Sequence, residues 1–150
     1  MPTTIGYILD TNIVIRLIRN DALGQQIDAK YNLRATLASS MVCVVTVGEL
    51  LAFARKIGWG QKKLEALQKM LDELVCLDIN PDEIIEAYSK IDHFSEKVVK
   101  PACPLGQNDM WIAATAKATG ATLLTTDKDF NHLDGTHISR IWIDPDSKTI

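Results

Sequence analysis

Short apolar or β-branched runs alternate with longer amphipathic stretches along the chain. The short runs lie at 7–9, 41–45, 75–79, 121–126 and 140–143. Runs of this length between polar turns are typical of buried strands. Elsewhere, apolar side chains recur at steps of three and four residues, which predicts helices over 13–19, 23–40, 46–58, 61–74, 81–92 and 109–119. Strands that alternate with helices indicate an α/β fold with a mainly parallel sheet of about five strands.

Local signals predict where several helices begin. Thr46 and Glu49 have the T-x-x-E spacing of a capping box. Pro81 suits the first position of a helix because it lacks a backbone N–H, and Asn108 suits the cap of the next one. The stretch 93–107 contains two prolines and a glycine and has little periodicity, so we expect an irregular lip beside a site.

The composition indicates one globular domain over 1–150, with 47% apolar and 23% charged residues. The run at 5–9 is too short for a signal peptide, and no stretch approaches the roughly 20 apolar residues of a membrane span, so we expect a cytoplasmic protein. The net charge of −3 argues against a protein that coats nucleic acid through bulk electrostatics. It does not exclude a nuclease, because a bound Mg²⁺ makes an acidic site locally attractive to phosphate.

Four acids stand where predicted strands give way to turns or helices. Asp10 follows the first strand, Glu49 the second and Asp127 the fourth, while Asp109 lies in the first turn of a helix. The carboxyl ends of parallel strands meet at one edge of a sheet, where ligands bind. Carboxylates gathered there repel one another unless protons or a divalent cation neutralise them. The pattern therefore favours a metal-dependent hydrolytic site.

Each acid taken alone also has a local explanation. Asp10 is compatible with an Asx turn, Glu49 with its half of the capping box, Asp109 with a favourable helix dipole, and Asp127 with a turn. Four such local roles at one sheet edge would be independent coincidences. The metal-site interpretation needs only that the acids converge.

Four ordered segments, LDTNIVI, TVGELL, GQNDMWIAATA and LLTTDKDF, resemble the motifs of PIN-domain nucleases. They are most similar to those of the VapC-type ribonuclease toxins of VapBC toxin-antitoxin pairs. The likeness runs from about Ile5 to Trp142. It implies a three-layer fold, a homodimer, and a small antitoxin protein as partner. It also implies cleavage of RNA, such as transfer or ribosomal RNA, with Mg²⁺ or Mn²⁺.

The resemblance places the family's four acids on residues of this chain. They fall on Asp10, Glu49, Asp109 and Asp127, supported by Thr11, Asn12 and Asn108. Asp129 is acidic too and competes with Asp127 for the fourth position. We expect Asp10 and Asp109 to contact the cation, with Glu49 and Asp127 completing the set. Asn12 and Asn108 would orient water.

Two alternatives stay open at this stage. The strand followed by DTN also occurs in phosphatases of the haloacid-dehalogenase kind, but those need a second aspartate where this chain has Asn12. A non-catalytic module that binds RNA or a partner is the other, and the complete acid quartet argues against it.

Basic residues near these motifs are candidates for contacts with RNA phosphates, although a solvated helix or loop position is the better explanation for any one of them. They are Arg16, Arg55, Lys56, Lys97 and Lys100. The histidines, His93, His132 and His137, lack the spacing of a zinc site, so we expect them at the surface or in loops.

Overall fold

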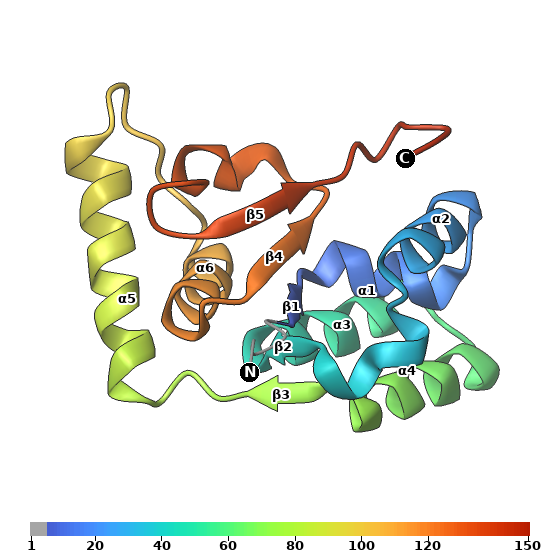
Figure 1. Ribbon diagram of the computed structural model, residues 1–150. Helices are drawn as coiled ribbons and strands as arrows, with labels where there is room; N and C mark the ends of the chain where they lie inside the picture. Colours follow the sequence, from blue (N-terminus) through green and yellow to red (C-terminus); the bar gives the residue numbers. More distant parts are fainter. Residues whose placement is uncertain (1–5) are drawn as a thin grey trace, which may run out of the picture.

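Five parallel strands form one sheet in the order β3-β2-β1-β4-β5 (Figure 1). The computed structural model describes residues 6–150, so Ile5, where the predicted motif likeness begins, lies outside the described residues. The strands are β1 (Tyr7–Leu9), β2 (Met41–Cys43), β3 (Val75–Leu77), β4 (Thr122–Thr125) and β5 (Ser139–Trp142). This sheet confirms the predicted α/β fold.

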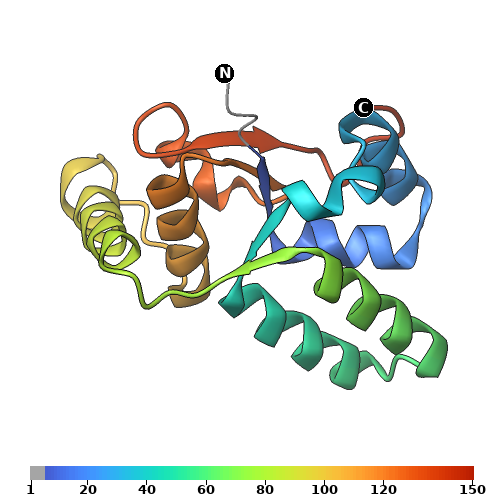
Figure 2. The ribbon, with the colours of Figure 1, turned by 60° about the horizontal axis from the view of Figure 1, so that its bottom comes forward.

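Helices cover both faces of the sheet (Figures 1 and 2). On one face lie α1 (Thr11–Arg19), α2 (Ala22–Tyr31), α3 (Val44–Ile57) and α4 (Gln61–Glu73). On the other lie α5 (Asp82–His93) and α6 (Gln107–Thr119). Three short helical turns complete the chain: η1 (Arg34–Ser39), η2 (Phe94–Val98) and η3 (Lys128–Leu133). The three predicted layers are therefore present.

Alternating side chains of the central strands enter two separate cores. Leu9 and Leu124 pack among the helices of the first face, whereas Ile8 and Leu123 pack against α6 and its neighbours. All four side chains are fully buried. Burial on both faces explains why these strands are continuously apolar rather than alternating. It also anchors the ends of β1 and β4, after which Asp10 and Asp127 follow in the chain.

The predicted helix over 23–40 is wrong in its length. Helix α2 ends at Tyr31, because Asn32 adopts a left-handed conformation with φ 54°, and the tighter turn η1 follows. Asparagine tolerates this conformation better than most residues. Leu33 and Leu37 are nonetheless buried. The apolar periodicity therefore predicted which side chains are buried, but it did not predict the end of the helix at Tyr31.

Other element boundaries differ from the predictions by a few residues. Strand β2 ends at Cys43, before the two valines assigned to it, and Pro81 is the N-cap of α5 rather than its first residue. The stretch 93–107 is less irregular than expected, because α5 runs to His93 and continues as the π-helical turn η2. In residues 6–150, no helix is long and apolar enough to cross a membrane.

Candidate metal centre

The parallel strands deliver the acids to one edge of the sheet. Asp10 directly follows β1, and Asp127 comes two residues after β4, which pairs with β1. Glu49 lies in α3, which starts immediately after β2, and Asp109 lies in the first turn of α6. Residues separated by more than a hundred positions in the chain therefore meet in one small region.

Asp10 is a buried carboxylate that neighbouring donors hold in place. It caps α1, with Oδ1 accepting from the Thr11 backbone N–H at 2.8 Å. Its Oδ2 accepts from the Thr125 hydroxyl at 2.6 Å and from the Asn12 amide at 3.1 Å. Only 4% of Asp10 is exposed, so these donors replace the water that a charged carboxylate requires.

Glu49 does not take part in a capping box, and that prediction is wrong. Helix α3 begins at Val44 with Cys43 as its N-cap and no side-chain cap, so Thr46 and Glu49 are already inside it. Thr46 is fully buried, with its hydroxyl 3.3 Å from that of Thr11. Glu49 accepts a 2.6 Å hydrogen bond from the Thr11 hydroxyl, which directs it towards Asp10. Glu49 therefore contacts Thr11, a residue distant in the sequence, instead of capping its own helix.

Asn108 is likewise not the cap of α6. Gly106 occupies the N-cap position, and Asn108 lies one residue inside the helix. Its amide donates to the second carboxylate oxygen of Glu49 at 3.2 Å, which links α6 to α3. Thr11, Glu49 and Asn108 thus form a hydrogen-bonded chain along one side of the acidic edge.

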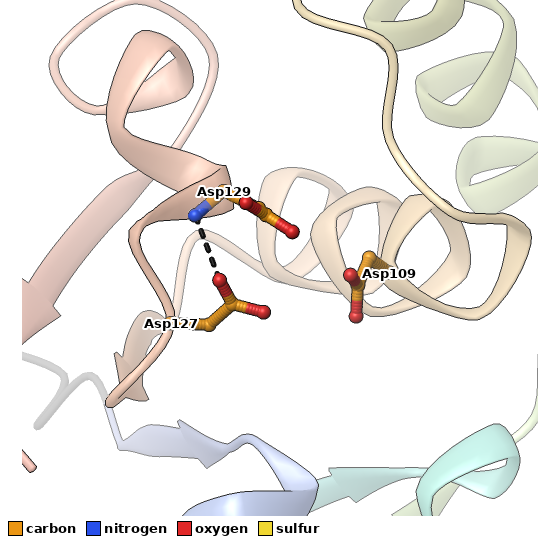
Figure 3. Close-up of side chains that lie close together, drawn as sticks. All are labelled: Asp109, Asp127 and Asp129. Carbon is orange, nitrogen blue, oxygen red and sulfur yellow. Dashed lines mark hydrogen bonds between the residues drawn. The ribbon is translucent and has the colours of Figure 1, made fainter.

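Asp109, Asp127 and Asp129 form the tightest acidic group (Figure 3). Each offers one carboxylate oxygen, and these three oxygens lie within 4.8 Å of one another. Asp127 caps η3 through a 2.8 Å hydrogen bond from the Asp129 backbone N–H. Both Asp127 and Asp129 therefore lie beside Asp109, and each is a candidate for the fourth acid. Asp10 and Glu49 are near enough to raise the pKa of Asp109, but among residues 6–150 they are not part of this group of close oxygens.

Burial and neighbouring acidic charges raise the pKa values of Asp10 and Asp109. Burial, followed by the charges of Asp10, Asp127, Glu49 and Asp129, raises the pKa of Asp109 to about 7. Burial also raises the pKa of Asp10 to about 6 against the hydrogen bonds it accepts, with Asp127 and Glu49 adding to the rise. Ordinary aspartates titrate near pH 4. The site therefore carries negative charge that a divalent cation would neutralise.

The donor set fits a hard cation. Mg²⁺ and Mn²⁺ prefer oxygen ligands, and this site offers carboxylate oxygens from Asp109, Asp127 and Asp129 with no sulfur or imidazole in the group. Three carboxylates that approach this closely, with Asp10 and Glu49 beside them, repel one another and are costly to hold together without a counter-ion. The residues present are thus compatible with the cation that the sequence motifs implied.

Thr125 and Thr126 take part in the site although sequence reasoning gave them no role. The buried Thr125 hydroxyl donates to Asp10 and accepts from the Asp127 backbone N–H at 2.9 Å, so it joins two of the acids. The Thr126 backbone N–H donates to the Asn12 amide oxygen at 3.1 Å. A hydroxyl-bearing residue at the end of an otherwise apolar strand was the available signal.

The predicted RNA-contacting residues occupy different surroundings. Arg16 is engaged in a 2.8 Å salt bridge with Asp21, which leaves its charge partly neutralised. Lys56 lines a hollow of about 620 Å³ that includes Glu49, so it is the best placed of the five. Arg55 lines a separate hollow on the α3 and α4 surface, while Lys97 and Lys100 are exposed.

The pKa values of Asp10 and Asp109 predict how pH changes the stability of the metal-free protein. Both carboxyls bind protons more tightly in the folded state than in the unfolded state. Their stabilising contribution to the free energy of unfolding is therefore full below about pH 4 and is lost as the pH rises through 6 and 7. Burial is the main reason that the pKa values of His132 and His137 are lowered. Their titration therefore changes the stability only below about pH 6.5. From pH 6.5 to 8 in EDTA, we expect the melting temperature to fall by about 2 °C, after allowing for solvent screening of Asp109.

Thermal unfolding at several pH values in EDTA and in Mn²⁺ measures this effect. The trend should reverse with Mn²⁺, because the metal binds ionised carboxylates. In Asp109→Asn, the fall in EDTA should largely disappear. A wild-type melting temperature that rises over this range without metal would contradict the prediction.

Comparisons with known proteins agree on one fold. Residues 7–136 match the family model described as the PIN domain. A chain of VapBC-1 from nontypeable Haemophilus influenzae is 25% identical, with a TM-score of 0.68 over 91% of this chain and 96% of that chain. A chain of VapBC2 from Rickettsia felis, bound to a DNA fragment from its promoter, is 25% identical, with a TM-score of 0.62 over 89% and 97% of the two chains.

A chain of the DNA-bound VapBC from Salmonella typhimurium is 21% identical and has a TM-score of 0.69, covering 91% of this chain and 98% of that chain. At this identity the similarity establishes the fold alone. No curated protein sequence matches the chain significantly.

Proposed function

This chain belongs to the PIN domain family, and we propose that it is a Mg²⁺- or Mn²⁺-dependent endoribonuclease that hydrolyses phosphodiester bonds in RNA. One observation carries the proposal. Asp109, Asp127 and Asp129 bring their oxygens together at the same sheet edge that Asp10 and Glu49 border, and burial together with the neighbouring acidic charges raises the pKa of Asp109 to about 7. Such strain between carboxylates is typical of a functional site rather than of a structural ion pair.

In this proposal, Asp109, Asp127 and Asp129 would hold the cation, which replaces the expected contact by Asp10 and Asp109, and Asp10 and Glu49 would complete the acidic set. When bound, the cation would activate water and offset charge on the phosphate that is attacked and on the leaving oxygen. The acids carry negative charge, so without the cation they would repel the phosphates of RNA. Substrate binding and catalysis therefore depend on the same group of side chains.

Several neutral side chains keep the acids in place. Thr11 and Asn108 each donate to Glu49, and Asn12 donates to Asp10 while its amide oxygen accepts from Thr126. Because each donor also belongs to a helix start or strand end, the carboxylates are oriented before any ligand arrives. We assign Thr11, Asn12 and Asn108 this positioning role.

We further propose that the chain is the toxin of a type II toxin-antitoxin pair. The VapBC chains that are 25% identical to it support this assignment. The hollow beside Glu49 also suits a protein partner, since Ile15, Val45, Ala52 and Phe53 give it an apolar wall. An amphipathic antitoxin segment lying there would reach the acidic edge and block it. Homodimer formation remains a prediction from the resemblance.

The purified chain should cut RNA at discrete positions in Mn²⁺ and stop when EDTA is added. The substrates are transfer and ribosomal RNA, and the new ends are mapped by sequencing. We expect a rate difference of at least about a hundredfold between Mn²⁺ and EDTA, because the acids cannot act without a cation. Single-stranded DNA of the same sequence is the control for RNA preference.

The same experiment separates the remaining alternatives. RNA that is bound but left intact in Mn²⁺ would favour the non-catalytic module over the nuclease. The phosphatase alternative no longer has support, because the match to the PIN domain covers residues 7–136 and includes every acid of the site. Release of inorganic phosphate from small phosphomonoesters would be needed to revive it.

A further inference from the structure

A second hollow borders the acidic group on the side of η3. It has a volume of about 560 Å³ and is lined by Cys103, Pro104, Lys128, Asp129, Asn131 and His132. Because Asp129 belongs to both, the hollow and the acidic group are continuous. Its size falls within the range of about 300–1,000 Å³ that is usual for small-ligand sites. It therefore offers space for one unit of a longer substrate.

The lining of this hollow combines a cation with groups that suit a nucleobase. Lys128 is held with its Nζ 5.0 Å from the centre of the Trp142 ring, and the Trp142 indole donates to the Thr126 carbonyl at 3.0 Å. No salt bridge within residues 6–150 involves Lys128, so its charge is available to a phosphate. Asn131 is exposed, which leaves its amide open to pair with a base edge.

His132, which lines the hollow, is held by contacts with two residues outside the lining. His132 shares a 2.8 Å hydrogen bond with the hydroxyl of Ser95, which is 1% exposed. Phe94 stacks parallel to the His132 ring, with an interplanar angle of 4° and a centroid distance of 6.3 Å. The ring is thereby fixed from two sides as a flat surface. Unstacked RNA bases commonly rest on aromatic rings of this kind.

We propose that this hollow binds the nucleotide next to the scissile phosphate, with Lys128 contacting its phosphate and Asn131 selecting its base. The inference rests on the proposed function, since it takes RNA as the substrate of the acidic group. A nucleotide linked to the phosphate at that group must lie in a space that borders it. The hollow beside Glu49 also has a lysine and an amide, Lys56 and Asn108, but only the hollow at η3 adds an imidazole and shares Asp129 with the acidic group.

Binding of fluorescent single-stranded RNA tests the proposal independently of cleavage. The probes are homopolymers of each base, about eight nucleotides long, with Ca²⁺ as the cation and their integrity checked on a gel. Lys128→Ala should weaken binding about tenfold for every base. It should also make the slope of log affinity against log salt concentration shallower by about one. Asn131→Ala should weaken binding about tenfold for one base only.

Matched controls are Lys62→Ala and Asn80→Ala, which remove the same groups from exposed positions on α4 and before α5. All variants should retain the Mn²⁺-dependent rise in melting temperature, showing that the acids are intact. RNA affinities equal to those of the controls would overturn the proposal. So would a wild-type chain that binds no RNA.

The cleavage assay then distinguishes the two proposals. If the variants lose RNA affinity as expected but the wild type leaves RNA uncut in Mn²⁺, the nucleotide site stands and the nuclease assignment fails. If the wild type cuts RNA and Asn131→Ala cuts with an unchanged base preference beside the cleaved bond, the nucleotide site fails and the nuclease assignment stands.

Discussion

Asp109→Asn is expected to lower RNA cleavage by about a thousandfold while making the metal-free protein more stable. Loss of a side chain that merely supports a metal ligand typically costs about 10- to 100-fold, and Asp109 is proposed as the ligand itself. The same change removes a carboxylate that Asp10, Asp127, Glu49 and Asp129 repel. At pH 8 in EDTA, the melting temperature should therefore rise by about 3 °C.

Cleavage rates in Mn²⁺ and thermal unfolding in EDTA measure the two effects. Asp92→Asn is the matched control, since Asp92 is an exposed acid on α5 and its change alters the net charge equally. It should affect neither quantity. The assignment of Asp109 fails if the variant cuts RNA like the control, whatever happens to its stability. A variant that is inactive but less stable in EDTA would show that repulsion does not dominate the site.

Thr125→Val should impair both stability and catalysis, although Thr125 is not expected to touch the cation or RNA. Valine has nearly the same shape, so packing is preserved while the hydroxyl that joins Asp10 to the Asp127 backbone is lost. A buried Asp10 oxygen then lacks its shortest hydrogen bond. We expect a loss of about 2 kcal/mol in the free energy of unfolding and a decrease in cleavage of about 10- to 100-fold.

Two variants separate positioning from simple destabilisation. Thr115→Val removes another fully buried hydroxyl, one that bonds to the Trp111 carbonyl within α6. It should lower stability while keeping the wild-type affinity for Mn²⁺. Thr125→Ser keeps the hydroxyl and should recover most of the activity. Equal Mn²⁺ affinities in Thr125→Val and Thr115→Val, measured by titration, would show that Thr125 has only a structural role.

The order of elements was predictable because it depends on local periodicity. Strands buried on both faces need continuous apolar runs, and helices need an apolar side chain at every third or fourth residue. Both patterns can be recognised in the sequence. Breaks and caps were less predictable. Asn32 ends a helix by its backbone conformation, and the Thr46 and Glu49 pair looked like a local cap while serving a distant contact. Tertiary contacts outweighed the local preference there by satisfying buried groups.

By itself, the sequence determined that acids would follow the strands and that these strands would be parallel and buried. Only the tertiary structure decided which acids meet. It brought Asp129 beside Asp109 and Asp127, surrounded Asp10 with three donors, and gave Thr125 its linking role. It also formed the hollow that contains Lys128 and Asn131. Strand order and helix packing set these distances, and both arise from burial of apolar surface across the whole chain, which no local pattern encodes.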